Sequence, residues 1–168
     1  MNCLMLWLYR LMTWWLPESR GFGYKNLLLR LSGARLGKNV RIYTSARILG
    51  TGPLVIGNDV HIGPEAMIYT NCNAKVVIGN NVDIASRVTI LTGSHEVNPD
   101  GAHIAGRGTA KDVVIGDGCW IGANATVFGG VTLWEKTIVA AGCVVLRGAD
   151  RGLCLLAGVP AEVRKVYG

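Results

Sequence analysis

The chain has 168 residues, of which 50% are hydrophobic, 23 are glycine and only 2 are phenylalanine. This length and composition suit one domain and exclude fibrous and disordered classes. The formal net charge is +6, but it is uneven, because residues 1–47 hold eight Lys or Arg against Glu18 alone, a balance of +7. This basic arm would meet anionic lipid or a phosphorylated substrate, or would form a solvated face. No nucleic-acid-binding module is recognisable, so we expect no nucleic-acid partner.

The segment from Cys3 to Leu16 is almost entirely apolar, contains three tryptophans and is followed by Pro17. It is too short to span a bilayer, and it lacks the basic region and the cleavage site of a secretory signal. Two interpretations remain open: a helix that packs on the protein or on a neighbouring subunit, and an interfacial anchor with tryptophans at the headgroup level. A second helix is expected over Tyr24–Leu31. Residues 1–32 would then form a helical arm of a cytoplasmic protein, peripheral on the inner face of the cytoplasmic membrane in the anchor interpretation.

From residue 33 onward, apolar residues recur at intervals of six. The unbroken stretch consists of Ile115, Ile121, Val127, Leu133, Val139 and Val145. A helix repeats near 3.6 residues and a strand every two, so a sustained period of six indicates three short strands per turn of a β-solenoid. The same spacing upstream predicts five coils, which start at Leu36, Ile56, Ile78, Ile115 and Leu133. A second inward residue is expected two positions before each aliphatic, as at Cys119 and Cys143.

Glycine follows several inward aliphatics, for example at Gly57 and Gly116. Either a positive φ or a close approach of the next coil would exclude a side chain there. We expect left-handed turns at Asn58, Asn80 and Asn124. The five cysteines are an odd number, and two of them occupy inward positions. Packing in a reducing cytoplasm is therefore expected, rather than a disulfide framework.

The repeat is broken most severely between Ile90 and Ile115, where residues 92–111 are expected to leave the solenoid as an irregular loop. Loops on a rigid scaffold often carry function. His95 stands at the exit of a regular coil, so the scaffold fixes its backbone while its imidazole can face a cleft. A histidine near neutrality can take a proton from an attacking hydroxyl. We therefore predict that His95 is a general base, oriented by Glu96 or by a backbone carbonyl.

Four segments carry a resemblance to a known family: Gly33-Ala34-Arg35-Leu36-Gly37-Lys38-Asn39-Val40, Ile78-Gly79-Asn80-Asn81-Val82, Val114-Ile115-Gly116-Asp117-Gly118-Cys119-Trp120-Ile121-Gly122 and Ala157-Gly158-Val159-Pro160-Ala161. The chain resembles the left-handed β-helix hexapeptide acyltransferases, in particular the maltose/galactoside and cell-surface polysaccharide O-acetyltransferase branch. The resemblance implies an all-β fold, a left-handed parallel β-helix over residues 33–168 with a C-terminal tail at 146–168. It also implies acetyl-coenzyme A as donor and a homotrimer with active sites between subunits.

The resemblance further implies roles for individual residues. In that family the histidine at the position of His95 is the catalytic base, and an Asn of the preceding coil, matched here by Asn71, binds the acceptor or orients the base. We also expect Asp83 to contact the acceptor. The expected contacts to the pantetheine arm of coenzyme A are Trp120, Ala123 and Ala141. The expected contacts to its phosphates are Lys111, Arg147, Arg164 and Lys165.

The expected reaction is direct transfer of an acetyl group to a saccharide hydroxyl in cell-surface polysaccharide or lipopolysaccharide biosynthesis. A nucleotide sugar or another small acceptor is the alternative within acyl transfer. A metal-dependent hydratase of the same fold would need three well-placed histidines. The only histidines of this chain are His61, His95 and His103, and only one of them stands at the end of a regular coil, so we expect no metal. A non-catalytic solenoid scaffold is the remaining alternative.

Overall fold

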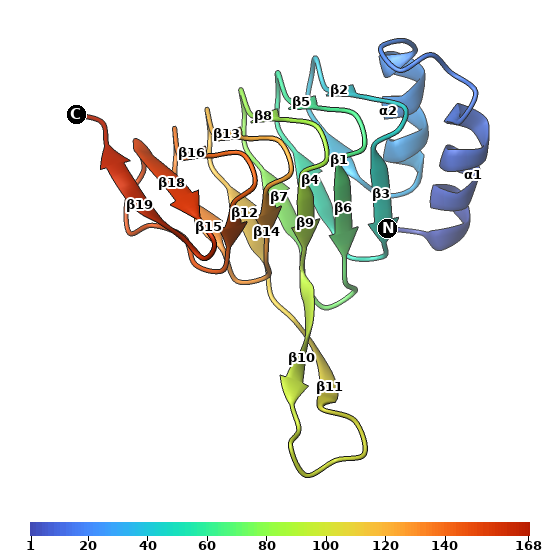
Figure 1. Cartoon of the computed structure of the whole chain (residues 1–168). Coiled ribbons are helices and arrows are strands. Elements are labelled where there is room, and N and C mark those ends of the chain that lie inside the picture. Colours follow the sequence, from blue (N-terminus) through green and yellow to red (C-terminus); the bar gives the residue numbers. More distant parts are fainter.

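The computed structural model describes residues 1–168, and it places two helices at one end of an elongated body of short strands (Figure 1). The body has three faces, each a sheet of parallel strands. The first face contains β1 (Arg35–Leu36), β4 (Leu54–Ile56), β7 (Val76–Ile78), β12 (Val113–Ile115) and β15 (Thr132–Leu133). The second contains β2 (Arg41–Ile42), β5 (His61–Ile62), β8 (Asp83–Ile84), β13 (Trp120–Ile121), β16 (Ile138–Val139) and β18 (Cys154–Gly158). The third contains β3 (Arg47–Gly50), β6 (Met67–Thr70), β9 (Thr89–Leu91), β14 (Thr126–Val127) and β17 (Val144–Val145).

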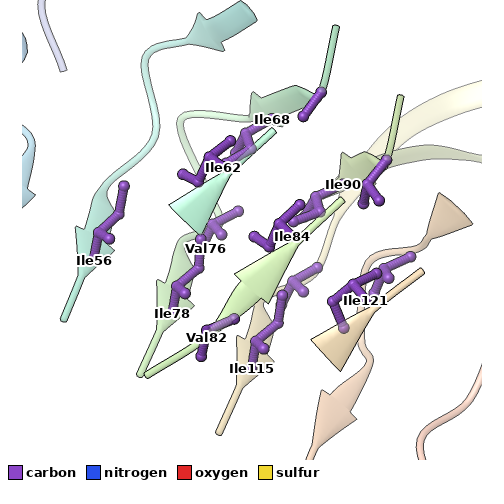
Figure 2. Close-up of a cluster of buried hydrophobic side chains, with 14 of the residues drawn as sticks. Ile56, Ile62, Ile68, Val76, Ile78, Val82, Ile84, Ile90, Ile115 and Ile121 are labelled. Carbon is purple, nitrogen blue, oxygen red and sulfur yellow. The ribbon is translucent and has the colours of Figure 1, made fainter. Parts of the chain in front are cut away.

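The expected left-handed parallel β-helix is confirmed, and the aliphatic repeat forms its core. Residues one coil apart stand in register, so that Ile62, Ile84 and Ile121 form one column of buried side chains (Figure 2). The second inward positions are buried as well, including Cys119 and Cys143. Five complete coils are present, as expected. The strand β18 begins a sixth coil that the sequence analysis did not predict, although buried Cys154 and Leu156 continue the same pattern.

The glycines that follow the inward aliphatics are required by close packing between coils. None of the glycines after inward aliphatics has a positive φ, so that alternative was wrong. A Cβ on Gly116 would lie 2.8 Å from the backbone nitrogen of Glu135, and a Cβ on Gly57 would lie 2.5 Å from the carbonyl oxygen of Gly79. Side chains are therefore excluded where the backbone of the next coil passes.

The prediction of left-handed turns was correct for Asn124, with φ of 58°, and wrong for Asn58 and Asn80. At those two corners the positive φ falls one residue later, at Asp59 and Asn81. The side chains of Asn58 and Asn80 instead join successive coils. The backbone N–H of Asn58 donates to Asn80 Oδ1 at 2.9 Å, and that of Asn80 donates to Asp117 Oδ1 at 2.7 Å. A ladder of side-chain acceptors thus satisfies the corner amides.

The helices α1 (Cys3–Thr13) and α2 (Phe22–Leu31) cover the first coil. The helix α2 begins two residues earlier than expected, and its Lys25 is fully buried, with Nζ donating to Thr44 Oγ1 at 3.1 Å. Asn2 caps α1, because its Oδ1 accepts from the backbone N–H groups of Leu4 and Met5. Neither helix is long and apolar enough to cross a membrane.

The corners of the body differ in regularity. Four residues separate consecutive strands at every corner between the first and second faces, and at every corner between the second and third. All insertions fall between the third and first faces, at an edge that we call the loop corner, made by the turns after β3, β6, β9, β14 and β17. The largest insertion was expected to be an irregular loop, but it forms an antiparallel hairpin of β10 (Gly93–Val97) and β11 (Ala105–Ala110) (Figure 1). The C-terminal tail is also ordered, because β19 (Ala161–Val166) pairs antiparallel with β18.

Candidate functional site

The root of the hairpin forms a cleft at the loop corner. The cleft has a volume of about 300 Å³ and is lined by Thr92, Ser94, His95, Thr109, Lys111, Phe128, Gly129 and Leu146. His95 lies on β10 opposite Gly108 of β11, where no side chain from the partner strand stands against it. Its side chain is exposed and forms no hydrogen bond within the chain. The imidazole is therefore accessible to a ligand in the cleft.

Backbone and side-chain hydrogen bonds fix the hairpin to the coil above it. The backbone N–H of Thr92 donates to the carbonyl of Tyr69 at 3.2 Å, and that of Lys111 donates to the carbonyl of Thr92 at 2.9 Å. Thr92 is buried, and its Oγ1 accepts from the backbone N–H of Asn71 at 2.7 Å. The two ends of the insertion are thus held together at the loop corner, which fixes the backbone that carries His95, three residues after Thr92.

Asn71 belongs to the loop corner one coil earlier, as expected from the sequence. Its Oδ1 accepts from the backbone N–H of Asn73 at 3.3 Å and from the thiol of Cys72 at 3.4 Å. A Cβ added at Gly93 would lie 3.7 Å from the Nδ2 of Asn71. The amide of Asn71 therefore faces the start of the strand that carries His95.

Glu96 does not orient the imidazole in this structure. It follows His95 at a point where the hairpin register shifts, and it forms no hydrogen bond or ion pair. Adjacent residues of a strand point to opposite faces, which separates the two side chains. No backbone carbonyl accepts a hydrogen bond from the imidazole of His95 either. Neither of the two orienting groups that the sequence suggested therefore contacts the imidazole in the single chain.

The other predicted contacts divide into two groups in a single chain. Lys111 and Arg147 lie at the loop corner with His95. Asp83 and Trp120 are paired neighbours on the second face, which is the face opposite that corner. They line a shallow hollow together with His61, Ile84 and Ala85. The prism therefore separates the predicted base from the predicted acceptor contact Asp83.

The remaining donor contacts lie away from the loop corner. Ala123 and Ala141 stack at the corner between the second and third faces, where the backbone N–H of Gly142 donates to the carbonyl of Ala123 at 2.8 Å. Arg164 and Lys165 lie on β19. The guanidinium of Arg164 is paired with Glu162 at 3.4 Å, and the ammonium of Lys165 lies 4.8 Å from the ring centroid of Tyr167.

The uncharged residues of the cleft were not predicted from the sequence: Thr92, Ser94, Thr109, Phe128, Gly129 and Leu146. The register itself contained a signal for two of them. Phe128 and Leu146 directly follow the inward residues Val127 and Val145 of the third face, so both must stand at the loop corner. Their apolar side chains lie on successive coils below His95.

Other chemistries find less support in the arrangement of the side chains. Burial raises the pKa of the Cys119 thiol to about 11, and its Sγ donates to the carbonyl of Trp134 at 3.0 Å. A thiol with such a pKa is a poor nucleophile near neutrality. No group of three His, Cys, Asp or Glu side chains is arranged to hold a metal ion. His61 packs against Tyr43, with ring centroids 5.2 Å apart, and His103 lies in the exposed tip of the hairpin.

Comparison with known proteins agrees with this architecture. Residues 112–147 match the model of the hexapeptide repeat of succinyl-transferase. The putative colanic acid biosynthesis acetyltransferase WcaF of Escherichia coli K12 is 29% identical over 164 residues, which cover 92% of this chain and 85% of that protein. The galactoside O-acetyltransferase of Escherichia coli K12 is 31% identical over 113 residues, or 64% of this chain and 54% of that protein. The chain thus carries the hexapeptide repeat over residues 112–147 and resembles the hexapeptide-repeat acyltransferases over most of its length.

A solved acetyltransferase structure shares the fold of nearly the whole chain. The hexapeptide-repeat acetyltransferase VCA0836 of Vibrio cholerae O1 biovar eltor superposes with a TM-score of 0.67 at 23% identity, and covers 97% of this chain and 85% of that one. That protein was crystallised with acetyl-coenzyme A, the donor that the sequence of this acyltransferase led us to expect. The expected enzyme class, an acyltransferase, is thus confirmed.

Proposed function

We propose that this acyltransferase transfers the acetyl group of acetyl-coenzyme A to a hydroxyl of a saccharide, with His95 as general base. The observation that carries the proposal is the cleft at the root of the hairpin. It places an accessible imidazole beside the hydroxyl groups of Ser94 and Thr109 and the ammonium of Lys111, on a backbone that the scaffold holds in place.

The proposed reaction is a direct transfer. The imidazole of His95 takes the proton of the acceptor hydroxyl as the oxygen attacks the thioester carbon. The tetrahedral oxyanion then collapses and expels the thiolate of coenzyme A, which is protonated on release. Backbone N–H groups near the thioester would stabilise the negative charge of the intermediate. No covalent acyl-enzyme is needed, which agrees with the burial of Cys119, Cys143 and Cys154.

A homotrimer with sites between subunits is part of the proposal. The single chain separates His95 from Asp83 and Trp120, which lie on the opposite face. A cyclic arrangement would bring the loop corner of one copy against the second face of the next, and would join the two half-sites. Lys111 and Arg147 of one copy would then meet the anionic groups of the donor beside Ala123 and Ala141 of its neighbour.

For the acceptor we infer a saccharide of cell-surface polysaccharide or lipopolysaccharide biosynthesis. WcaF is named for colanic acid biosynthesis, and it aligns with nearly the whole chain. The galactoside O-acetyltransferase of Escherichia coli supports the hydroxyl of a sugar as the reacting group. A nucleotide sugar remains the second candidate.

The test follows the thiol released from acetyl-coenzyme A across a panel of free sugars, nucleotide sugars and extracted lipid-linked glycans. Turnover with one acceptor class should fall by about 10²–10⁴-fold in His95→Ala, which is the usual contribution of a general base. His103→Ala is the matched control, because that histidine lies at the tip of the same hairpin, outside the cleft. Equal rates for both variants would remove His95 from the mechanism. Absence of thiol release with every acceptor, together with absence of coenzyme A binding, would favour a non-catalytic scaffold.

The shared site has a separate test. His95→Ala and Trp120→Ala subunits are each expected to be inactive as homotrimers. Coexpression should restore about a quarter of the sites, because random assembly then pairs an intact His95 with an intact Trp120 of the next copy. A mixture that stays inactive, or a stable monomer in sedimentation, would contradict a site between subunits.

A further inference from the structure

The helix α1 is apolar on both sides. Its inner side buries Leu6, Tyr9 and Thr13 against the body. Its outer side and the turn that follows expose large apolar side chains: Leu4 at 60%, Trp7 at 58%, Leu11 at 50%, Trp14 at 74% and Trp15 at 65%. At 3.6 residues per turn these five fall on one stripe of the helix and its continuation. A soluble protein rarely leaves such a stripe without a partner.

The stripe continues into a groove on the body. Trp7 and Leu11 line it from α1, Trp14 lines it from the turn that follows, and Ile48, Leu49 and Gly50 line it from β3. The groove has a volume of about 580 Å³ and its only charged residue is Arg10. Helix, groove and strand therefore form one apolar surface at the helical end of the molecule, which we call the α1 surface.

Unpaired positive charge borders the α1 surface. Arg10 and Arg47 line a second hollow beside Trp14, which also contains Glu18, whose carboxylate accepts hydrogen bonds from Ser45. Neither arginine takes part in an ion pair, since the three pairs in the structure involve other residues. The same end of the chain carries the excess charge, because residues 1–47 have eight basic residues against Glu18 while the whole chain has a net charge of +6. An acidic partner is therefore favoured over a neutral one.

We propose that the α1 surface docks on an anionic lipid bilayer. The chemistry fits such a partner: tryptophans prefer the headgroup region, the aliphatic side chains and the groove take up hydrocarbon, and arginines bind anionic headgroups. The 11 residues of α1 make a helix of roughly 16 Å, about half the thickness of the hydrocarbon core, so it lies in the plane of the interface. The buried side chains of Leu6, Tyr9 and Thr13 keep α1 packed on the body while its outer side contacts the bilayer.

The fold leaves the proposed catalytic cleft free in this orientation. The helices occupy one end of the prism, and the hairpin leaves the body farther along it (Figure 1). Docking is thus independent of the acetyl transfer proposed above, and its failure would leave that proposal untouched.

The experiment measures binding of the full chain to lipid vesicles by flotation. One set of vesicles contains equal parts of phosphatidylglycerol and phosphatidylcholine, and the other contains phosphatidylcholine alone. The chain should float with the anionic vesicles and bind the neutral ones more weakly, by about fivefold for each arginine at the surface. The double substitution Trp7→Ser/Trp14→Ser should lower the partition coefficient on anionic vesicles by at least about tenfold. Arg10→Gln should weaken binding to anionic vesicles only.

The matched control is Trp134→Ser, because Trp134 is 48% exposed but follows β15, far along the prism from α1. It should bind vesicles like the unaltered chain. Turnover of a soluble acceptor should be the same in all three variants. A chain that does not float with anionic vesicles overturns the proposal. If Trp7→Ser/Trp14→Ser also changes the sedimentation coefficient in the absence of lipid, the α1 surface is a contact between copies of this chain instead.

Discussion

Replacing Ile84 by Ala should destabilise the chain strongly, because the side chain is fully buried between Ile62 and Ile121 of the adjacent coils. The substitution removes three carbon atoms, and each buried methylene contributes about 0.8 kcal/mol, so the transfer term is about 2.4 kcal/mol. The parallel ladders fix the distance between coils, and the column cannot collapse into the space. With the cavity term, the free energy of unfolding should fall by about 3–4 kcal/mol.

Urea denaturation at matched protein concentration measures this loss, and Ile138→Ala provides the control. Ile138 is also a strand isoleucine of the second face, but it points outward and is only half-buried. Its replacement should reduce the free energy of unfolding by less than about 1 kcal/mol. Similar losses for the two variants would refute the assignment of inward and outward positions, and with it the register of the second face.

Two further predictions concern titratable groups outside the proposed site. The pKa of the Asp117 carboxyl is lowered by the backbone N–H of Asn80 and then by its side-chain amide. Its contribution to stability is thus present above the ordinary pKa of about 3.9 and is lost as the pH falls through the lower folded value. The difference in melting temperature between the unaltered chain and Asp117→Asn should therefore shrink between pH 7 and pH 3, and a constant difference would argue against the ladder. The second prediction concerns the cysteines. Iodoacetamide at pH 8 should quickly label the exposed Cys3 and Cys72, and should label the buried Cys119, Cys143 and Cys154 only after unfolding, as measured by intact-mass spectrometry. Rapid labelling of all five cysteines would contradict the burial of the last three.

The sequence predicted the repeat well because each coil depends on few residues. Two inward side chains, two positions apart, recur in each six-residue repeat, so one uninterrupted run from Ile115 to Val145 determines the register of its neighbours. The sixth coil was not predicted because the chain from Val145 to Leu156 forms no strand on the first face, which interrupts the six-residue spacing. The prediction of left-handed turns at Asn58 and Asn80 was wrong because their backbone N–H groups donate to side chains of the next coil. No local sequence pattern reveals this contact.

The site was less accessible to sequence reasoning. The position of His95 at a coil exit was visible, because the break in the repeat marks it. The hairpin within the insertion was not visible in the sequence, since β10 and β11 lack the alternation of apolar and polar residues that marks a strand. The separation of Asp83 from His95, in contrast, was contained in the register, because Asp83 precedes the second inward residue of its coil, Ile84, whereas His95 follows the third, Ile90.

The three edges of the prism differ in how freely their length can change. Along two of them every turn has four residues, and an added residue would slip the register of every coil that follows. Along the loop corner the spacing between inward residues is 8 from Ile48 to Ile56, 10 from Ile68 to Ile78 and 25 from Ile90 to Ile115, yet β4, β7 and β12 pair in one continuous register. Each doubling of such a loop costs only about 0.6 kcal/mol in closure entropy. Segments on this one edge can therefore lengthen while the strands beneath them keep the same partners, so the surroundings of the proposed base can change without any change in the core.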